Sequence, residues 1–210
     1  MTKQTTTQDV IDLQERQWLP RFCAGDIDSF HHLVKAYQTP LYHYLIRHQV
    51  GETHRDDLLQ DIFIRIHQGA SQYQPDKPLR PWIYTIAANT MRNFFRDSAK
   101  HQHETFDEQS SACDYPNQFE QLSDQEHQQW LASQLHRLPL TQKEALILLT
   151  TEGFSLKETA EIMNCPVNTV KTLAHRARQS LMQQFANTHA LSNQPASSNP
   201  ALSNKGEQHV

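Results

Sequence analysis

The stretch from Phe154 to Arg178, FSLKETAEIMNCPVNTVKTLAHRAR, constrains the fold most, because it predicts two helices joined by a tight turn. Ser155 and Glu158 have the spacing of a capping box, in which each side chain bonds the backbone N–H of the other residue. Asn164 tolerates a left-handed backbone and Pro166 lacks an N–H, so the first helix is expected to end between them. A second helix is expected to begin just after the proline.

Both predicted helices place apolar residues at helical spacing. These are Leu156, Ala160 and Met163 in the first helix and Val170, Ala174, Ala177 and Leu181 in the second. The polar side of the second helix is rich in hydrogen-bond donors and has no carboxylate; it carries Asn168, Thr169, Lys171, Thr172, His175, Arg176 and Arg178. This arrangement is typical of a helix-turn-helix, whose second helix enters the DNA major groove. An ordinary helical hairpin with a solvated basic face is the alternative.

The chain of 210 residues has room for one or two domains, and its formal net charge is −4. The charge is segregated along the sequence. Residues 76–100 hold five Lys or Arg against two acids, whereas residues 101–130 hold seven acids and no Lys or Arg. The mild net charge therefore hides a basic segment beside an acidic one.

The cysteines and histidines indicate no bridge or metal. Cys23, Cys113 and Cys165 are far apart and odd in number, which argues against a disulfide framework and suits a reducing cytosol. His101 and His103 have no cysteine at zinc-site spacing, so neither a metal nor a cofactor is expected. The N-terminus has no signal-peptide core, and no apolar run approaches membrane-spanning length, so we expect a soluble cytoplasmic protein without membrane insertion.

Periodicity predicts three helical segments in the N-terminal half, which are Asp26–Leu45, Arg55–Gln68 and Pro81–Asp97. Pro40 is expected to kink or divide the first segment. The second segment has an apolar stripe and an opposite polar face that includes Asp57, Gln60 and Asp61. From the residues alone, this polar face is that of an ordinary solvated helix.

The third segment has a polar side of amides and arginines. It includes Thr85, Asn89, Arg92, Asn93 and Arg96, with the aromatic residues Tyr73, Trp82 and Tyr84 nearby. Amides, arginines and aromatic rings are the groups that hold phosphates and stack on exposed bases. Aromatic residues at helical spacing are also typical of a core, so most of these rings are expected to be buried.

The rest of the chain predicts a linker, one further helix and a tail. Residues 98–125 are polar and acidic and are expected to form a flexible linker. Thr141 and Glu144 have the spacing of a second capping box, at the start of a helix that packs on the helix-turn-helix. From Asn187 onward the low-complexity sequence is expected to be disordered. The predicted fold is all-α, with two small helical domains joined by a flexible acidic linker and a helix-turn-helix in the C-terminal domain.

Four blocks in order carry a resemblance to a known family. They are GDIDSFHHLVKAYQTPLYHYL, DDLLQDIFIRIHQ, PLRPWIYTIAANTMRNFFR and LPLTQKEALILLTTEGFSLKETAEIMNCPVNTVKTLAHRAR. Together they resemble the extracytoplasmic-function (ECF) sigma factors, the small two-domain class of sigma-70-type initiation factors of bacterial RNA polymerase. The likeness spans roughly residues 26–185.

The resemblance implies how the chain is divided. It implies a flexible N-terminus (1–17), region 2 (18–98), an acidic flexible linker (99–127), region 4 with the helix-turn-helix (128–186) and a disordered tail (187–210). Region 2 would bind core polymerase and would recognise and melt the minus-ten promoter element. Region 4 would recognise the minus-thirty-five element, and the acidic linker would lie in the RNA-exit channel.

The resemblance also implies roles for residues and partners. Asp57, Gln60 and Asp61 would dock on the clamp helices of the largest polymerase subunit, and the second subunit's flap is a further expected contact. Asn89, Arg92, Asn93 and Arg96 would face the opened minus-ten strand, where an unstacked base is held. The donor-rich face from Asn168 to Arg178 would meet the minus-thirty-five duplex. Promoter DNA, core RNA polymerase and an anti-sigma factor are thus the expected partners.

Three positions depart from the family pattern. Asn168 stands where the family usually has Gly, Leu173 stands where it usually has Arg, and Asn93 stands where many members have Asp. Leu173 falls at the edge of the core stripe, so base reading is expected to shift to its neighbours.

Two other classes of function fit the sequence less well. A free-standing helix-turn-helix regulator would need a ligand pocket or a self-complementary face, and it leaves the polar faces of the N-terminal half without a role. An enzyme is not expected, because the five glycines form no phosphate-cradling loop and no nucleophile lies beside a base.

Overall fold

The structure is a computed structural model that describes residues 12–102 and 133–192. Within these ranges every regular element is a helix, which confirms the predicted all-α class. The elements are α2 (Trp18–Cys23), α3 (Ile27–Arg47), α4 (Glu52–Gly69), the 3₁₀ turn η1 (Ala70–Gln72), α5 (Leu79–Gln102), α7 (Leu140–Thr150), α8 (Leu156–Ile162) and α9 (Val167–Ser192). The predicted linker, residues 99–127, lies almost entirely outside the described residues. No helix in the described ranges is long and apolar enough to cross a membrane.

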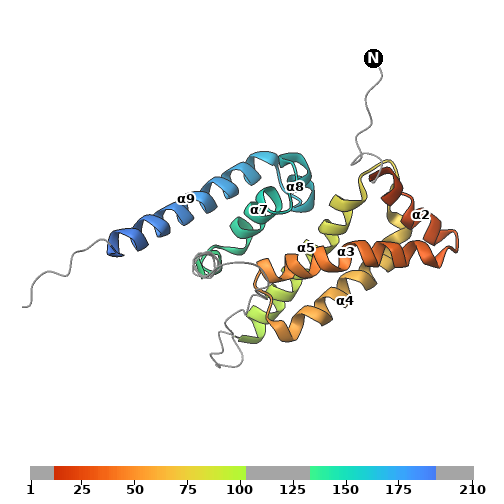
Figure 1. Cartoon of the computed structure of the whole chain (residues 1–210), viewed down its shortest axis with the longest axis horizontal. Coiled ribbons are helices and arrows are strands. Elements are labelled where there is room, and N and C mark those ends of the chain that lie inside the picture. Colours follow the sequence, from red (N-terminus) through yellow and green to blue (C-terminus); the bar gives the residue numbers. More distant parts are fainter. Residues whose placement is uncertain (1–11, 103–132, 193–210) are drawn as a thin grey trace, which may run out of the picture.

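Helices α2 to α5 form a first helical group, in which α3, α4 and α5 lie along one another (Figure 1). Their apolar stripes meet in a core that includes Leu33, Leu41, Ile62, Ile66 and Ile83, all without solvent exposure. Burial of each such side chain contributes about 1.5–3 kcal/mol to folding before the entropic cost is counted. The periodic stripes of the sequence therefore define this core.

Helix α3 begins where the sequence places a cap. The Asp26 carboxylate accepts hydrogen bonds from the Ser29 N–H, at 3.3 Å, and from the Ser29 hydroxyl, at 2.6 Å. These bonds lower the pKa of Asp26. Pro40 lies inside α3 without dividing it, so of the two expected outcomes, a kink or a division, the division is wrong.

The N-terminal edge of the first group extends before α2. Residues 12–15 are helical, and the Tyr37 hydroxyl on α3 donates to Glu15 at 2.7 Å. Burial raises the pKa of Tyr37, so its hydroxyl stays a donor at physiological pH. Residues 12–15 thus pack on the bundle, although they fall within the N-terminal part, 1–17, that was expected to be flexible.

Helices α7 to α9 form the second helical group, and α8 begins with the predicted capping box. The Glu158 N–H donates to the Ser155 hydroxyl at 3.2 Å, and the Ser155 N–H donates to the Glu158 carboxylate at 2.9 Å. Asn164 then adopts a left-handed φ of 50°, which ends α8 as expected and turns the chain toward α9.

The predicted stripe of α9 is buried at its first three positions and partly buried at Leu181, and the stripe of α8 is buried except at Leu156. Val170, Ala174 and Ala177 are buried, whereas Leu156 at the start of α8 is 37% exposed. Helix α9 continues to Ser192, past Asn187 where the disordered tail was expected to begin.

The second predicted capping box, at Thr141 and Glu144, is wrong. Helix α7 begins at Leu140 with Pro139 at its N-cap and no side-chain cap, so Thr141 already lies inside the helix. Glu144 is fully buried instead of reaching back to the helix start. On the same helix, Leu146 packs with Leu138 and Ala177, as expected for packing on the helix-turn-helix.

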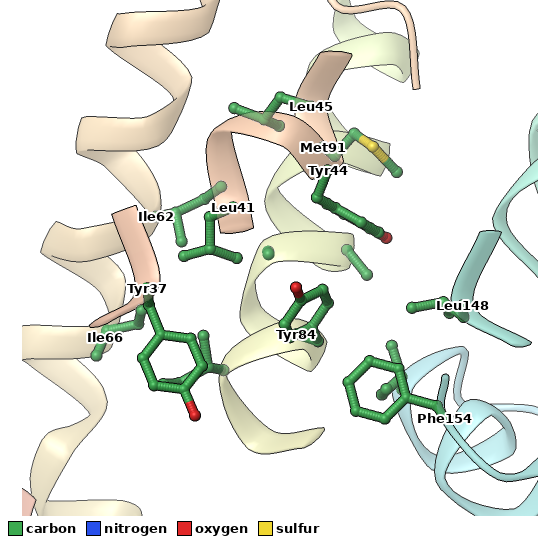
Figure 2. Packing of buried hydrophobic residues seen from close by; sticks show 14 of the residues in the cluster. Tyr37, Leu41, Tyr44, Leu45, Ile62, Ile66, Tyr84, Met91, Leu148 and Phe154 are labelled. Atoms are coloured by element: carbon green, nitrogen blue, oxygen red, sulfur yellow. The ribbon is translucent and has the colours of Figure 1, made fainter. Parts of the chain in front are cut away.

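The two helical groups share one hydrophobic core. Tyr84 of α5 stacks edge-on against Phe154, which precedes α8, with ring centroids 5.0 Å apart. Leu148 of α7 lies beside this pair and points toward α5 (Figure 2). A single buried cluster therefore continues from α3 and α4, through α5, into α7 to α9.

The capping box yields a test of the second group. Replacing Ser155 with Ala leaves the Glu158 N–H without its side-chain acceptor, so we expect the free energy of unfolding to fall by about 1 kcal/mol. Urea denaturation followed by circular dichroism measures this loss. A Ser155→Ala chain as stable as the wild type would show that the box contributes nothing.

Candidate nucleic-acid interface

The donor-rich face of α9 is open to solvent. All seven predicted duplex-binding residues are exposed, namely Asn168, Thr169, Lys171, Thr172, His175, Arg176 and Arg178. The buried stripe on the other side of α9 fixes which way these side chains point. The Thr172 hydroxyl donates to the Asn168 carbonyl at 2.9 Å, and this bond orders the first turns. Leu173 is half-buried against the core, as expected from its position at the edge of the stripe.

The charge and shape of this face suit a DNA groove. Between Val167 and Ala186 there is no acidic residue, and Lys171, Arg176 and Arg178 supply positive charge. In Figure 1, α9 projects away from the first helical group. Lys and Arg can bind phosphates or guanine edges, and Thr and Asn can bind base edges or backbone.

The polar side of α5 is only partly open. Asn89 and Arg96 are exposed, and Arg96 pairs with Asp97 at 3.3 Å. Asn93 and Arg92 are half-buried. The four residues predicted to face the opened strand therefore do not form one uniformly exposed surface.

Arg92 points toward the second helical group. Its Nη2 donates to the Ile162 carbonyl of α8 at 3.1 Å, and its Nε lies 3.5 Å from the Glu144 carboxylate of α7. Nε also donates to the Ala88 carbonyl within α5 at 3.2 Å. Two donors of Arg92, a residue predicted to bind the opened strand, are thus engaged by the protein itself.

The aromatic residues near α5 are mostly core, as expected. Tyr84 is fully buried and Tyr73 is 6% exposed, whereas Trp82 is half-buried. Trp82 and Tyr73 pack edge to face with ring centroids 5.4 Å apart. An open cleft of about 670 Å³ lies beside them, lined by Trp82 and Thr85 of α5 and by Glu158 and Glu161 of α8. Of the three rings, only Trp82 retains a surface on which a base could stack.

The polar face of α4 is exposed as predicted. Asp57, Gln60 and Asp61 lie outward at helical spacing. Ile64, one turn further along the same face, is 44% exposed. The sequence interpretation missed Ile64, although its absence from the buried stripe was the available signal. This acidic face with an apolar end is a suitable surface for a protein partner.

A buried ion cluster between the two groups was not found from the sequence. The Glu152 carboxylate, 6% exposed, accepts from Arg47 at 2.8 Å and from the Tyr84 hydroxyl at 2.6 Å. Arg80 lies 3.3 Å from the same carboxylate, donates to the Glu152 carbonyl at 2.8 Å and stacks 4.2 Å from the centre of the Phe154 ring. Burial, followed by the nearby Glu152 charge, raises the pKa of Tyr84 and keeps its hydroxyl a donor. The buried Glu152 carboxylate is therefore both paired with cations and hydrogen-bonded.

Glu144 differs from Glu152, because its buried carboxylate lacks hydrogen bonds. It is fully buried beside Arg92, but neither of its oxygens accepts a hydrogen bond from a described residue. Burial raises the pKa of Glu144 to about 7, against the opposing effect of Arg92. Burial, followed by the nearby Glu144 charge, raises the pKa of Tyr44 and the pKa of Cys165. The described residues contain no group of three or more His, Cys, Asp or Glu that could hold a metal ion.

The buried Glu144 predicts a pH-dependent difference between the wild type and Glu144→Gln. Because its pKa is raised on folding, Glu144 takes up a proton in the folded state, so the wild type loses stability as the pH rises from about 4.5 to about 7. The amide is neutral throughout. We expect Glu144→Gln to raise the melting temperature relative to the wild type at pH 8, and this gain to shrink by pH 5.5.

Calorimetry at the two pH values measures the gain. Glu161→Gln removes the same charge from an exposed position on α8 and is the matched control. A gain from Glu144→Gln that is equal at both pH values would contradict the raised pKa.

Comparisons with known proteins agree with this arrangement. A family model described as sigma-70 region 2 matches residues 33–101, and one described as sigma-70, region 4 matches residues 128–181. The ECF RNA polymerase sigma-E factor of Haemophilus influenzae is 27% identical over 190 residues, which cover 86% of this chain and 96% of that relative. The ECF RNA polymerase sigma factor EcfG of Rhodopseudomonas palustris is 35% identical over 127 residues, which cover 60% of this chain and 68% of the relative.

A solved structure shares the fold. It is the sigma factor RpoE in complex with the anti-sigma factor NepR from Bartonella quintana, with a TM-score of 0.66 and 23% identity, covering 75% of this chain and 96% of that one. The first family model covers most of α3, all of α4 and α5 up to residue 101, and the second covers α7, α8 and the first part of α9, which include the helix-turn-helix. The chain therefore belongs to the ECF sigma factors of the sigma-70 family, which direct RNA polymerase to promoters and initiate transcription.

Proposed function

We propose that this sigma factor divides promoter recognition between α9 and α5. The exposed face of α9 reads the minus-thirty-five element as duplex, and the polar side of α5 around Asn89 holds the minus-ten strand after it opens. The observation that carries the first part is the run of seven exposed residues from Asn168 to Arg178, free of acids and backed by a buried stripe. Such a helix fits the major groove.

The second part is supported by the chemistry of α5. Asn89 is exposed and can bond the edge of a base that has left the stack, and Arg96 is exposed beside it on the same side of the helix. Trp82 retains a partly exposed ring for stacking. Arg92 and Asn93 join this surface when the second helical group moves away from α5.

Polymerase binding is proposed for the face of α4. Asp57, Gln60 and Asp61 supply acceptors and an amide, and Ile64 supplies an apolar contact at one end. We assign this face to the clamp helices of the largest polymerase subunit, and the second-subunit flap to the second helical group. Because core polymerase contributes most of the binding energy, DNA affinity of the free chain is weak.

An anti-sigma factor is the remaining proposed partner. The Bartonella quintana sigma factor of the same fold was solved in complex with one.

The proposed tasks of this chain need no cofactor and no catalytic group, since it acts by binding and by positioning DNA. They take place in the cytoplasm, where polymerase works.

The division of labour predicts two different defects. Arg176→Ala should weaken promoter use that depends on the upstream element by about 1–3 kcal/mol, roughly 5- to 150-fold, because one major-groove or phosphate contact is lost. Asn89→Ala should impair strand opening with little effect on upstream protection. DNase footprints report upstream contact and permanganate footprints report opening.

Lys35→Ala, an exposed cation on α3, is the matched control for the charge lost in Arg176→Ala. If both variants lost opening and upstream protection to the same extent, the two elements would not be read by separate helices.

The polymerase contact predicts a third defect. Gln60→Ala combined with Asp61→Ala should lower affinity for core polymerase by roughly 10-fold or more, since both side chains are exposed at the proposed centre of the contact. Fluorescence anisotropy with labelled sigma factor measures this. Asp28→Asn, an exposed acid on α3, should bind as the wild type does, and an unchanged affinity of the double variant would exclude this face.

A further inference from the structure

The N-terminal end of the described chain contacts the loop that precedes α5. Arg16 directly follows the helical residues 12–15, and its side chain is 21% exposed. Its Nη1 donates to the Asp76 carbonyl at 3.2 Å, across 60 residues of sequence. Its Nε donates to the Asp12 carboxylate at 3.1 Å, and Nη2 pairs with the same carboxylate. One guanidinium thus joins the N-terminal segment to this loop.

The loop, residues 73–78, lies between η1 and α5. Pro75 and Pro78 have no N–H, so a regular backbone ladder cannot hold it. The Tyr73 hydroxyl donates to the Lys77 carbonyl at 2.6 Å, and the Lys77 N–H donates to the Gln74 carbonyl at 3.0 Å. The bond from Arg16 to Asp76 is added to these from outside the loop. Side chains therefore contribute much of what fixes the shape of the loop.

The loop forms part of the open cleft of about 670 Å³ beside Trp82. Gln74 and Lys77 line this cleft, and Gln72 lines it from η1. The Tyr73 ring packs against Trp82 with ring centroids 5.4 Å apart. Amide and ammonium groups can bond base edges or phosphates. A change in the shape of the loop would therefore move polar groups of the cleft and alter the packing of Trp82.

The segment that carries Arg16 is itself anchored on the bundle. The Tyr37 hydroxyl of α3 donates to the Glu15 carboxylate at 2.7 Å, and Leu19 of α2 is fully buried. Helix α2 packs on α3 and on η1. Arg16 therefore holds the Asp76 carbonyl from a support that lies outside the loop.

We propose that Arg16 is a positioning residue, which fixes residues 73–78 in the shape that a base of the opened strand meets in the cleft beside Trp82. The proposal rests on the proposed role of α5 in holding the minus-ten strand. Arg16 acts through the Asp76 carbonyl and does not contact the base. Its loss changes which bases are preferred and leaves polymerase binding as it is.

Hydrogen exchange of the full chain tests whether Arg16 holds the loop. Backbone amides of residues 73–78 should exchange faster in Arg16→Ala, and also in Tyr73→Phe, which loses the bond to Lys77 but keeps its ring. Exchange in α3 and α4 should match the wild type, because their core is untouched. Arg21→Ala removes an exposed cation of α2 and is the matched control, with wild-type exchange in the loop.

Holoenzyme tests the effect on base preference. The probe is a library of DNA templates with a duplex upstream part and an unpaired segment of random sequence, and the bound fraction is sequenced. Wild-type holoenzyme should enrich particular bases in the unpaired segment. In Arg16→Ala and in Tyr73→Phe the enrichment at the position held in the cleft should fall by roughly 5-fold or more, the discrimination that one base contact provides.

This readout separates positioning from folding. A variant that only loses folded protein binds less of every sequence alike and keeps the same enrichment. Upstream protection and affinity for core polymerase should be unchanged in Arg16→Ala, since the faces of α9 and α4 do not include this loop.

Trp82→Ala distinguishes the two ways in which the account can fail. If Trp82→Ala abolishes enrichment at a position where Arg16→Ala and Tyr73→Phe keep it, the strand lies in the cleft and the positioning role of Arg16 is overturned. Unchanged loop exchange in Arg16→Ala, or an equal effect of Arg21→Ala, overturns that role as well. If Trp82→Ala and Asn89→Ala both leave every enrichment intact, the proposed function of α5 fails, and the role of Arg16 fails with it.

Discussion

The arrangement of the two helical groups depends on the buried carboxylate of Glu152. A charge in the interior is tolerated only when it is paired and hydrogen-bonded, and Glu152 achieves this with Arg47, Arg80 and Tyr84 from the other group. Removing Glu152 would leave Arg47 and Arg80 without the carboxylate that they share. Tyr84 and Phe154 then extend the contact into the common hydrophobic core. The position of the second group over α5 follows from this set of contacts.

This position decides which functional surfaces are available. The assigned residues of α9 and of α4 are exposed, whereas the polar side of α5 is partly covered. Duplex reading and polymerase docking can therefore precede strand binding. Under the proposed roles, an initiation factor that contacts single strands only after docking on polymerase would avoid unproductive binding to DNA elsewhere.

Local features could be predicted from the sequence, and contacts between distant segments could not. Three local features depend only on residues close in sequence, and the structure has them as predicted. They are the capping box at Ser155, the left-handed Asn164 and the buried stripe of Val170, Ala174 and Ala177. Glu144 has cap spacing, but Pro139 starts the helix earlier, so the same pattern leads to a buried acid. Arg47 and Glu152 are 105 residues apart, and no periodicity pairs them. The residues proposed to contact DNA on α9 and polymerase on α4 are all exposed. On α5, the sequence did not predict that Arg92 contacts the second helical group.

The central claim is that the two groups are closed in the free protein and separate on polymerase. Single-molecule energy transfer measures this directly, with dyes at Lys35→Cys on α3 and Gln183→Cys on α9 in a chain whose native cysteines are replaced by serine. Both positions are exposed, and Gln183 lies beyond Arg178, the last residue of the face assigned to DNA. We predict high transfer for the free chain and a clear drop when core polymerase is added. Equal transfer in the two states would contradict the account.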